Sequence, residues 1–457
     1  MVSFLMCNCV LIKACSHRFS PKSLHVKPRL LLSSESLPSQ VRSLPPVLRR
    51  FAIATTLLSL LCVAVEFVCR HLSRYGLNQL PYSSPTLLLK DAYADAWLFN
   101  KRFYHFHSSS FFAPQYGSAY MYPAPLGFFY RLFRFFPHTT PAVLGFLLLV
   151  YLGLGIWLRH VLIERGLSNR AASLFSAVSV VFSYPLYFEF DRANMEIFVW
   201  GFAALGVLCF FRNRPWLAAT LIGCAAACKG YPFIFLGLLF ARKQYVQVVY
   251  SVALAVGINY FSLWALAGSI SMGKAGVAAG IAQFRDSYIL VRDPLSVGLD
   301  HSLFGFFKRF WPSLPASPEL GHLLTIYIAV AGVTACVLYL FFVMRLPAIN
   351  QLIFLTTACL LLPPTSFDYT LLHLYTPWVV LVTTAVDCQN RGMAVPRGIW
   401  PAMFCFIILL SPQNELIVHG VRVGAQVKCL ALLALTFVAL RLPLQRGTDL
   451  SESVVVA

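Results

Sequence analysis

The sequence has little charge. Only 12% of its 457 residues are charged, whereas 58% are hydrophobic, and the mean hydropathy is +0.71. Soluble domains carry about a quarter charged residues, and half that share cannot cover a water-facing surface of this size. The composition therefore excludes a soluble globular protein. The chain has room instead for about ten to twelve membrane-spanning helices of roughly 20 apolar residues each.

Acidic residues are scarcer than basic ones. The chain has 17 Asp and Glu against 36 Lys and Arg, a net charge of +19. The basic residues form short clusters between apolar runs, a pattern typical of the cytoplasmic loops of membrane proteins. We therefore expect the lipid bilayer, and no nucleic acid, as a partner. An aromatic content of 15% fits aromatic belts at the membrane interfaces.

Motifs for metal or nucleotide chemistry are also missing. Most of the 13 cysteines lie in apolar runs, where cysteine behaves as a small hydrophobic residue. Cys7 and Cys9 have no partners at metal-binding spacing, and Cys224 and Cys228 lack a second pair. The chain has no Gly-rich phosphate loop and no Ser-His-Asp order, and no soluble nucleotide-binding domain fits between the apolar runs. We expect no metal and no cofactor, so a transfer reaction would use a donor delivered by the membrane.

The sequence predicts three parts. Residues 1–50 carry eight Lys or Arg and one acidic residue, Glu35, which favours a disordered cytoplasmic extension; a cleaved targeting segment is the alternative. Residues 51–441 are expected to form the transmembrane domain, and residues 442–457 a cytoplasmic tail. Within the domain, residues 70–140 and 269–320 are expected on the non-cytoplasmic side, with short amphipathic helices at the membrane interface in the first of these segments.

Apolar runs predict the spanning helices. The expected spans are 51–69, 141–158, 171–188, 195–211, 215–228 with a break before 231–241, 246–268, 321–344, 350–364, 369–386, 398–411 and 424–441. Several are shorter than a straight crossing requires, and such helices are tolerated where they line a protein-enclosed or watery cavity. The prediction is an all-α polytopic membrane protein with about 11 to 12 transmembrane helices.

The basic clusters set the predicted topology. Arg49 and Arg50 precede the first span, which places the N-terminus in the cytoplasm by the positive-inside rule. Every later short basic cluster falls on the same side only if residues 215–241 form a hairpin of two half-helices. One continuous helix there would move those clusters outside. The charge pattern favours the hairpin, turning at Lys229-Gly230-Tyr231-Pro232.

Under this topology, five polar motifs gather on the non-cytoplasmic side. They are Asp91 to Asp95 with the aromatic run Tyr120 to Pro125, Glu189 to Glu196, Lys229 to Pro232, Arg285 to Ser302, and Pro363 to Tyr369 with His373. In the first, Asp91 and Asp95 are four residues apart and would face one way on a helix. This pair could be a general base or an ion ligand. The alternative is a helix N-cap with a solvated interfacial charge.

The next two motifs place charge against the membrane. Glu196 would project into the start of a span, where an ionisable residue is costly and usually functional, although loop solvation explains some charges of the Glu189–Glu196 segment. Lys229 interrupts an apolar stretch just before a helix break. It could extend to the interface, or it could meet a phosphate in an enclosed polar site.

The last two motifs each allow a functional and a purely structural interpretation. In the 269–320 segment, Arg285 and Arg292 could clamp a phosphate, with His301 near sugar hydroxyls, or the segment could be a simple soluble cap. After the Pro363-Pro364 helix stop, Asp368 and His373 could form a polar substrate wall or an ordinary turn.

The motifs together resemble a known family. The acidic start after the first helix, the Tyr122-Pro123-Ala124-Pro125 segment, the outer turn with Asn194, Lys229-Gly230-Tyr231-Pro232, and Leu362 to Tyr369 (Leu-Pro-Pro-Thr-Ser-Phe-Asp-Tyr) follow one another in the order seen in bacterial polyprenol-phosphate-sugar-dependent membrane mannosyltransferases. These are the enzymes of glycosyltransferase family 87, which have a GT-C fold. The resemblance covers roughly residues 51–440.

The resemblance implies inverting transfer of a hexose, typically mannose, from a polyprenyl-phosphate donor to a lipid or glycan acceptor outside the cytoplasmic leaflet. It implies Asp91 as the base, with Asp95 as second candidate. Together with the motifs, it gives as donor-phosphate ligands Lys229, Arg192, Arg285 and Arg292, and as sugar or acceptor ligands Asn194, Glu196, Tyr122, His301, Asp368 and His373. Where relatives often carry Asn or Gln before a Ser-Leu pair, this chain has His301-Ser302-Leu303.

The resemblance also implies a location, a multi-pass protein of the bacterial plasma (inner) membrane with its active site facing the periplasm or exterior. The alternative function is a secondary transporter or lipid flippase, which would place coupling charges near the bilayer centre and often shows inverted repeats. Because no repeat is visible and the polar motifs crowd one side, a glycosyltransferase is the favoured interpretation.

Overall fold

The computed structural model describes residues 43–73, 106–112, 120–135, 139–290, 298–310, 317–411, 417–418, 421–422 and 424–445. From Leu44 onward the chain forms one compact unit. Three of the predicted site residues, Asp91, Asp95 and Arg292, lie outside the described residues. The predicted division into an extension, a transmembrane domain and a tail stays a prediction.

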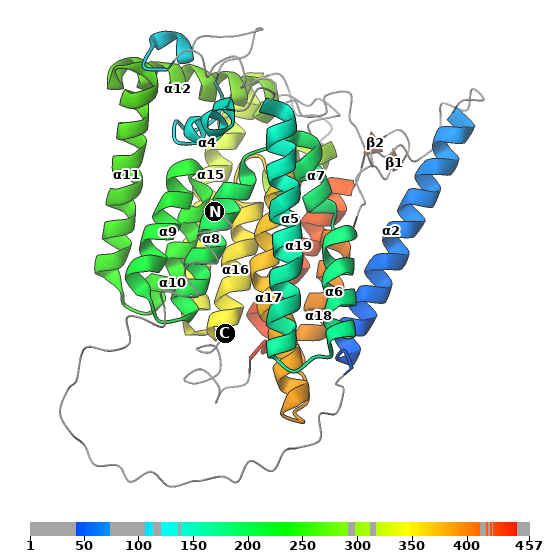
Figure 1. The fold of residues 1–457 in the computed structure, drawn as a ribbon. Coiled ribbons are helices and arrows are strands. Elements are labelled where there is room, and N and C mark those ends of the chain that lie inside the picture. The colour runs from blue at the N-terminus through cyan, green and yellow to red at the C-terminus, as the bar shows by residue number, and fades with distance from the viewer. Residues whose placement is uncertain are drawn as a thin grey trace, which may run out of the picture. The chain divides into compact units, whose positions relative to one another are not determined.

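The described part of the chain is almost entirely helical (Figure 1). The helices are α2 Pro46–Ser73, η2 Ser109–Phe111, α4 Leu126–Leu132, η3 Phe133–Phe135, α5 Thr139–Glu164, α6 Asn169–Val181, α7 Tyr184–Arg192, α8 Glu196–Phe211, α9 Pro215–Cys228, η4 Tyr231–Phe235, α10 Leu236–Ala241, α11 Tyr245–Ala267, α12 Ile270–Phe284, the π-helical η5 Arg285–Ile289, α14 Leu303–Phe310, α15 Ser317–Phe341, η6 Val343–Arg345, α16 Ala348–Leu361, η7 Asp368–Leu374, α17 Tyr375–Asn390, α18 Ile399–Leu410 and α19 Gly424–Arg441. Two short antiparallel strands, β1 Ile417–Val418 and β2 Val421–Arg422, precede α19.

Among the described residues, six helices are long and apolar enough to cross a membrane, and a seventh crossing results if α6 and α7, bent by 47° at their junction, count as one span. Five more apolar helices are shorter, namely α8, α9, η4 with α10, α16 and α18. The predicted all-α polytopic membrane fold is confirmed. The long helices, the bent pair and the shorter apolar helices of the described residues correspond to the spans expected from the sequence, and several of these spans are short.

The predicted hairpin within residues 215–241 is present. α9 ends at Cys228, and α10 returns the chain to the end from which α9 started. The Arg242 guanidinium, just after α10, donates to the carbonyl of Phe210 at 3.3 Å and to the Asn213 side chain at 2.8 Å. Both partners lie at the turn between α8 and α9, so the end of α10 and the start of α9 share one end of the bundle. Lys229 therefore lies at the other end.

Small residues let the helices around this hairpin approach closely. A Cβ on Gly206 of α8 would lie 2.8 Å from the Ile222 side chain of α9, and a Cβ on Gly223 of α9 would lie 2.9 Å from the carbonyl oxygen of Ser251 in α11. Such contacts are the usual basis of helix packing in membranes. They hold the short α9 between its two longer neighbours.

Several basic residues that were predicted to face the cytoplasm lie at one end of the bundle. Arg165 after α5 forms an ion pair with Asp387 near the end of α17. The Arg50 guanidinium lies 5.1 Å from the Trp400 ring at the start of α18. α18 starts beside the end of α19, because the amide of Gly398 donates to the carbonyl oxygen of Pro443 at 3.2 Å. These ends lie at the bottom of Figure 1.

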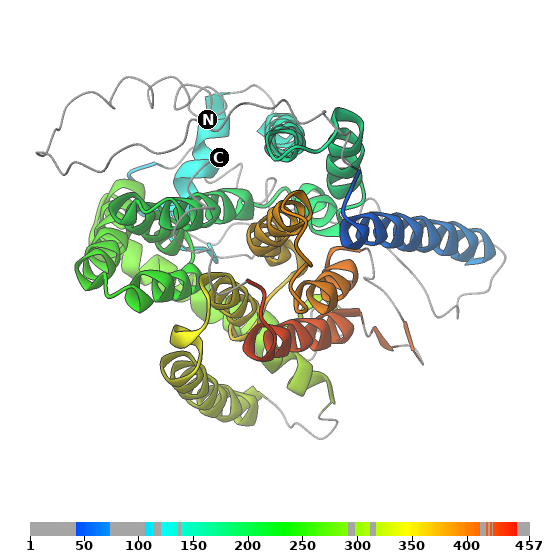
Figure 2. The ribbon, with the colours of Figure 1, turned by 90° about the horizontal axis from the view of Figure 1, so that it is seen from below.

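Short helices cover the opposite end. The left-handed Gly268 (φ 75°) separates α11 from α12, which runs across the end of the bundle in Figure 1. Gly280 of α12 lies against the chain at Tyr120, where an added Cβ would be 1.9 Å from the carbonyl oxygen. The amphipathic interfacial helices predicted for residues 70–140 correspond to η2 and α4 in the described part. Seen along the bundle, α2 and α15 lie at its margin (Figure 2).

Candidate active site

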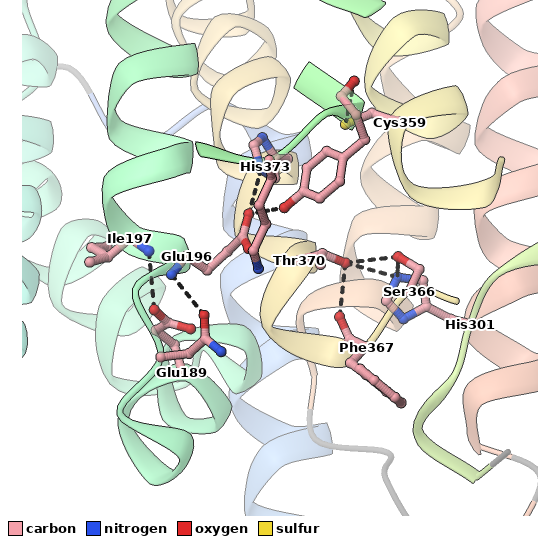
Figure 3. Close-up of polar contacts among 12 residues, drawn as sticks. Glu189, Glu196, Ile197, His301, Cys359, Ser366, Phe367, Thr370 and His373 are labelled. Atoms are coloured by element: carbon pink, nitrogen blue, oxygen red, sulfur yellow. Dashed lines mark hydrogen bonds and ion pairs between the residues drawn. The ribbon is translucent and has the colours of Figure 1, made fainter. Parts of the chain in front are cut away.

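A fully buried carboxylate lies at the end of the bundle that α12 covers. Glu196, the first residue of α8, is 0% exposed, and three side chains donate to it. The Lys229 ammonium lies 2.5 Å from Oε2, the His373 Nε2 lies 2.9 Å from Oε1, and the Tyr231 hydroxyl bonds to Oε1. The donors come from the end of α9, from η7 and from η4. We call these four residues the Glu196 cluster (Figure 3).

Neighbouring side chains fix the start of α8. The amide of Glu196 donates to Asn194 Oδ1 at 2.9 Å, and the amide of Ile197 donates to Glu189 Oε1 at 3.1 Å, as Figure 3 shows. Both bonds satisfy helix N-terminal amides that have no partner within the helix. Asn194 Nδ2 in turn donates to the Tyr122 hydroxyl at 3.1 Å. The turn before α8 thus sets the position of Glu196.

A second buried carboxylate, Asp368 at the start of η7, has partners of the same three kinds. The Lys428 ammonium and the Tyr184 hydroxyl each lie 2.6 Å from Oδ2, and His301 Nδ1 lies 3.2 Å from Oδ1. Asp368 is 1% exposed, and the side chains of His301 and Lys428 are 0% exposed. We call these four residues the Asp368 cluster. It joins α7, the start of α14, η7 and α19.

The turn before α14 is tied to the turn before η7. Asp300 and Phe367 form an isolated β-bridge, and Asp300 Oδ1 accepts from the amides of Ser302 at 3.0 Å and Ser366 at 2.9 Å. The other imidazole nitrogen of His301 lies 3.0 Å from the Ser366 hydroxyl, as Figure 3 shows. A Cβ on Gly305 would lie 2.6 Å from Asp300 Oδ2. Only glycine therefore fits at this point of α14.

One helix connects the two clusters. η7 carries Asp368 at its start and His373 in its last turn, so each cluster takes one member from it. Between them lies Tyr369, whose ring centre is 4.7 Å from the Lys229 ammonium. The two clusters are therefore adjacent parts of one polar site.

Seven of the predicted site residues belong to this site. The structure brings together Lys229, Glu196, His373, Asn194 and Tyr122 around α8, and His301 joins Asp368 next to them. Arg192, the last residue of α7, lies two residues before Asn194. Arg285 lies on η5, where it donates to Asp286 at 2.9 Å, and that bond raises the pKa of the exposed guanidinium.

Three residues that complete the clusters were not predicted as site residues. Tyr231 was named only as part of the helix break that follows Lys229. Lys428 is a single cation near the start of the apolar α19, and the argument that singled out Lys229 would have found it as well. Tyr184 lies in the apolar run before the Glu189–Glu196 segment. Nothing in the local sequence distinguishes this tyrosine from the other 19 in the chain.

An apolar groove of about 560 Å³ starts beside the Asp368 cluster. It lies between α14, α15, α16 and α19, and Leu303, Tyr327, Thr334, Leu361 and Thr436 are among its lining residues. Leu303 follows His301 and Ser302 directly, and Leu361 ends the helix before the Pro363-Pro364 turn. Most of the groove runs along α15, which is long and apolar enough to span a membrane. Such a groove suits a hydrocarbon chain.

The described residues contain no group of three or more His, Cys, Asp or Glu side chains that could hold a metal ion. Both carboxylates instead have a lysine as their counter-charge. The site can therefore offer cations and hydroxyls to an anionic or sugar-like ligand.

The model of glycosyltransferase family 87 matches residues 120–363. The chain belongs to glycosyltransferase family 87. This family 87 protein is thus a membrane glycosyltransferase, and the matched region contains the Glu196 cluster except for His373, together with His301 and Tyr184. Searches of curated proteins and of solved structures return no match.

Proposed function

We propose that this family 87 protein transfers a hexose, in the first place mannose, from a polyprenyl-phosphate donor to a lipid or glycan acceptor on the non-cytoplasmic side, with inversion. The observation that carries the proposal is Lys229, a buried cation whose side chain is 10% exposed, at the end of the bundle opposite the basic clusters. A departing lipid phosphate gains negative charge in the transition state, and a fixed cation stabilises it.

The chemistry assigns a role to each side chain. In this scheme the acceptor hydroxyl loses its proton to Asp91, with Asp95 as the second candidate. Its oxygen bonds to the anomeric carbon from the face opposite the phosphate, while the bond from that carbon to the phosphate oxygen breaks. Lys229 and Arg192 hold the leaving phosphate, and Arg285 and Arg292 meet the donor as it approaches. Tyr122, Asn194 and His373 line the sugar pocket, with His301 and Asp368 behind them. No metal is part of the scheme.

The apolar groove supports a lipid donor. It begins at the residues that follow His301 and continues along α15, so a hydrocarbon chain in it would leave the lipid at the polar site. We propose that it holds the polyprenyl chain. We expect the bacterial inner membrane as the location, with the site facing the periplasm or exterior, in keeping with the positive-inside rule.

The test is transfer of radiolabelled mannose from polyprenyl-phosphate-mannose to membrane acceptors. Asp91→Asn should reduce the rate by a factor of at least about 100, and Lys229→Ala by a similar factor, whereas Asp95→Asn should have a smaller effect. Undiminished transfer by Asp91→Asn would remove Asp91 as the base. No transfer from any polyprenyl-phosphate sugar, together with ion-dependent solute uptake, would indicate a transporter instead.

The sidedness has its own test. Cysteines placed at positions 91, 229 and 368 should react with a membrane-impermeant thiol reagent only from the non-cytoplasmic side. At the buried position 368, the reaction is expected only after detergent has loosened the protein. Cytoplasmic labelling of position 229 would contradict the proposed topology.

A further inference from the structure

We infer that Glu196 is a positioning residue, which sets where the Lys229 ammonium lies and so where a lipid-borne phosphate is held. The inference rests on the proposed function for the identity of the lipid, but its contacts are independent of the sugar. It differs from the expectation that Glu196 itself binds sugar or acceptor. Phosphate esters are the ligand class, and the lipid phosphate left after transfer is the simplest member.

The carboxylate of Glu196 is occupied by the protein. A carboxylate has about four acceptor positions, and three of those of Glu196 receive Lys229, Tyr231 and His373. The side chain is 0% exposed. A group in this state cannot take a proton from an acceptor hydroxyl without losing these bonds. Its oxygens therefore organise neighbouring residues and do not touch the substrate.

Lys229 is the member of the cluster that can reach a ligand. An ammonium group has three donors, and among the described residues the Lys229 ammonium has one hydrogen-bond acceptor, Glu196. The rings of Tyr369 and Tyr122 lie 4.7 Å and 5.4 Å from it, which leaves hydrogens without an oxygen acceptor. The side chain is 10% exposed, whereas that of Lys428 in the Asp368 cluster is 0% exposed.

Glu196 is itself held firmly. Asn194 caps its amide, and Glu189 caps the next one. Lys229 follows the last residue of α9 in an extended conformation, where the helix no longer restrains its side chain. The ion pair with Glu196 is thus the contact that gives this flexible side chain one position, and a fixed cation binds a phosphate better than a mobile one.

The experiment measures binding of decaprenyl phosphate and of inorganic phosphate to the purified full-length protein in nanodiscs. The variants are Glu196→Gln, Lys229→Met and the double variant. Glu196→Gln should weaken decaprenyl-phosphate binding by about 10-fold or more. The double variant should bind no more than about threefold more weakly than Lys229→Met, because a residue that acts through Lys229 has nothing left to position.

Three results would overturn the inference. Tighter binding by Glu196→Gln would mean that the carboxylate merely competes with phosphate for Lys229. Effects that multiply in the double variant would mean that Glu196 acts independently of Lys229. Wild-type protein that binds neither probe would show that no phosphate site exists. Equal affinity for inorganic and decaprenyl phosphate would overturn the lipid part, because the chain would then contribute nothing.

Two further variants separate position from charge and from general damage. Glu196→Asp keeps the charge but withdraws it by one methylene, so it should also weaken decaprenyl-phosphate binding, by about 3- to 10-fold; wild-type affinity would contradict the inference. Glu196→Asp also replaces Glu196→Gln as the test variant if Glu196→Gln does not fold. Asp387→Asn is the matched change in the ion pair with Arg165 at the opposite end of the bundle, and any folded preparation should retain decaprenyl-phosphate affinity within about threefold.

The failure of the proposed function is distinguishable from failure of this inference. Decaprenyl-phosphate binding with the expected variant pattern, but without mannose transfer, would reject the mannosyl donor and leave the role of Glu196 standing. Mannose transfer with an unchanged KM for the donor in Glu196→Gln would reject the role of Glu196 and leave the proposed function standing.

Discussion

The Glu196 cluster and the Asp368 cluster are built from the same parts. In each, a buried carboxylate takes one lysine, one histidine and one tyrosine. They differ in access: the Lys229 side chain is 10% exposed and the Lys428 side chain 0%. They differ also in their histidines. Both ring nitrogens of His301 lie close to side-chain partners, Asp368 and Ser366, whereas His373 contacts Glu196 through Nε2. The Glu196 cluster is therefore partly open at its lysine, whereas the Asp368 cluster is closed around its lysine.

The largest effect is expected from Lys428→Met. It would leave Asp368 as a buried charge without its cation, which costs about 3–5 kcal/mol of unfolding free energy. Thermal unfolding in detergent measures the loss. The matched variant Lys229→Met should lose less stability, because the Lys229 side chain is partly exposed and water can enter the space that it leaves. An equal loss in the two variants would show that the two clusters do not differ as described.

Removing both charges of the Asp368 cluster should undo much of that damage. The double variant Asp368→Asn with Lys428→Met replaces an ion pair by a neutral pair, and such replacements are often close to neutral in free energy. We expect it to unfold within about 2 kcal/mol of the wild type. A double variant that is less stable than Lys428→Met would show that Asp368 contributes mainly through Tyr184 and His301.

Gly280→Ala should act on one cluster only. Its Cβ would lie 1.9 Å from the carbonyl oxygen of Tyr120, so α12 and the segment at Tyr120 must move apart, at about 1–3 kcal/mol. That segment continues to Tyr122, which accepts a hydrogen bond from Asn194 beside Glu196, and donor affinity should fall as well. Gly332→Ala on α15 is the control, because nothing lies within 4 Å of its added Cβ. Equal behaviour of the two alanine variants would contradict this packing.

The smallest effect is expected from Arg285→Ala. Arg285 and Asp286 are 51% and 59% exposed, and exposed ion pairs contribute little to stability. The unfolding temperature should therefore not change, while the KM for the polyprenyl-phosphate donor should rise less than in Lys229→Met. A larger rise in KM than in Lys229→Met would show that the principal phosphate contact is Arg285 on η5 and not Lys229 after α9.

Much of the fold could be predicted from local patterns. The apolar runs predicted the helices, and the basic clusters predicted the reversal at Lys229, because charge is excluded from the bilayer wherever it lies in the sequence. Which of the expected spans are long helices and which are short could not be predicted, because the end of an apolar run does not fix where its helix stops. α9 and α16 each have 14 residues and are short helices inside the bundle.

The site was predicted only as a set of separate motifs. Glu196, Lys229 and His373 were each singled out, but not as partners, since Glu196 and His373 are 177 positions apart. The pairing of Asp368 with Lys428, which are 60 positions apart, was hidden for the same reason. Side chains that interact across a bundle leave no periodic signal in the chain.

The sequence by itself determined that this protein lies in a membrane, where most of its apolar helices lie, and which of the described polar motifs share one end of the bundle. These properties follow from the cost of placing charge and open backbone in lipid, which acts on each segment separately. Only the tertiary structure decided that each carboxylate has its own lysine, and that one of the two lysines stays within reach of a ligand. Burial and pairing depend on how α8, α9, η7 and α19 pack, which no single segment encodes.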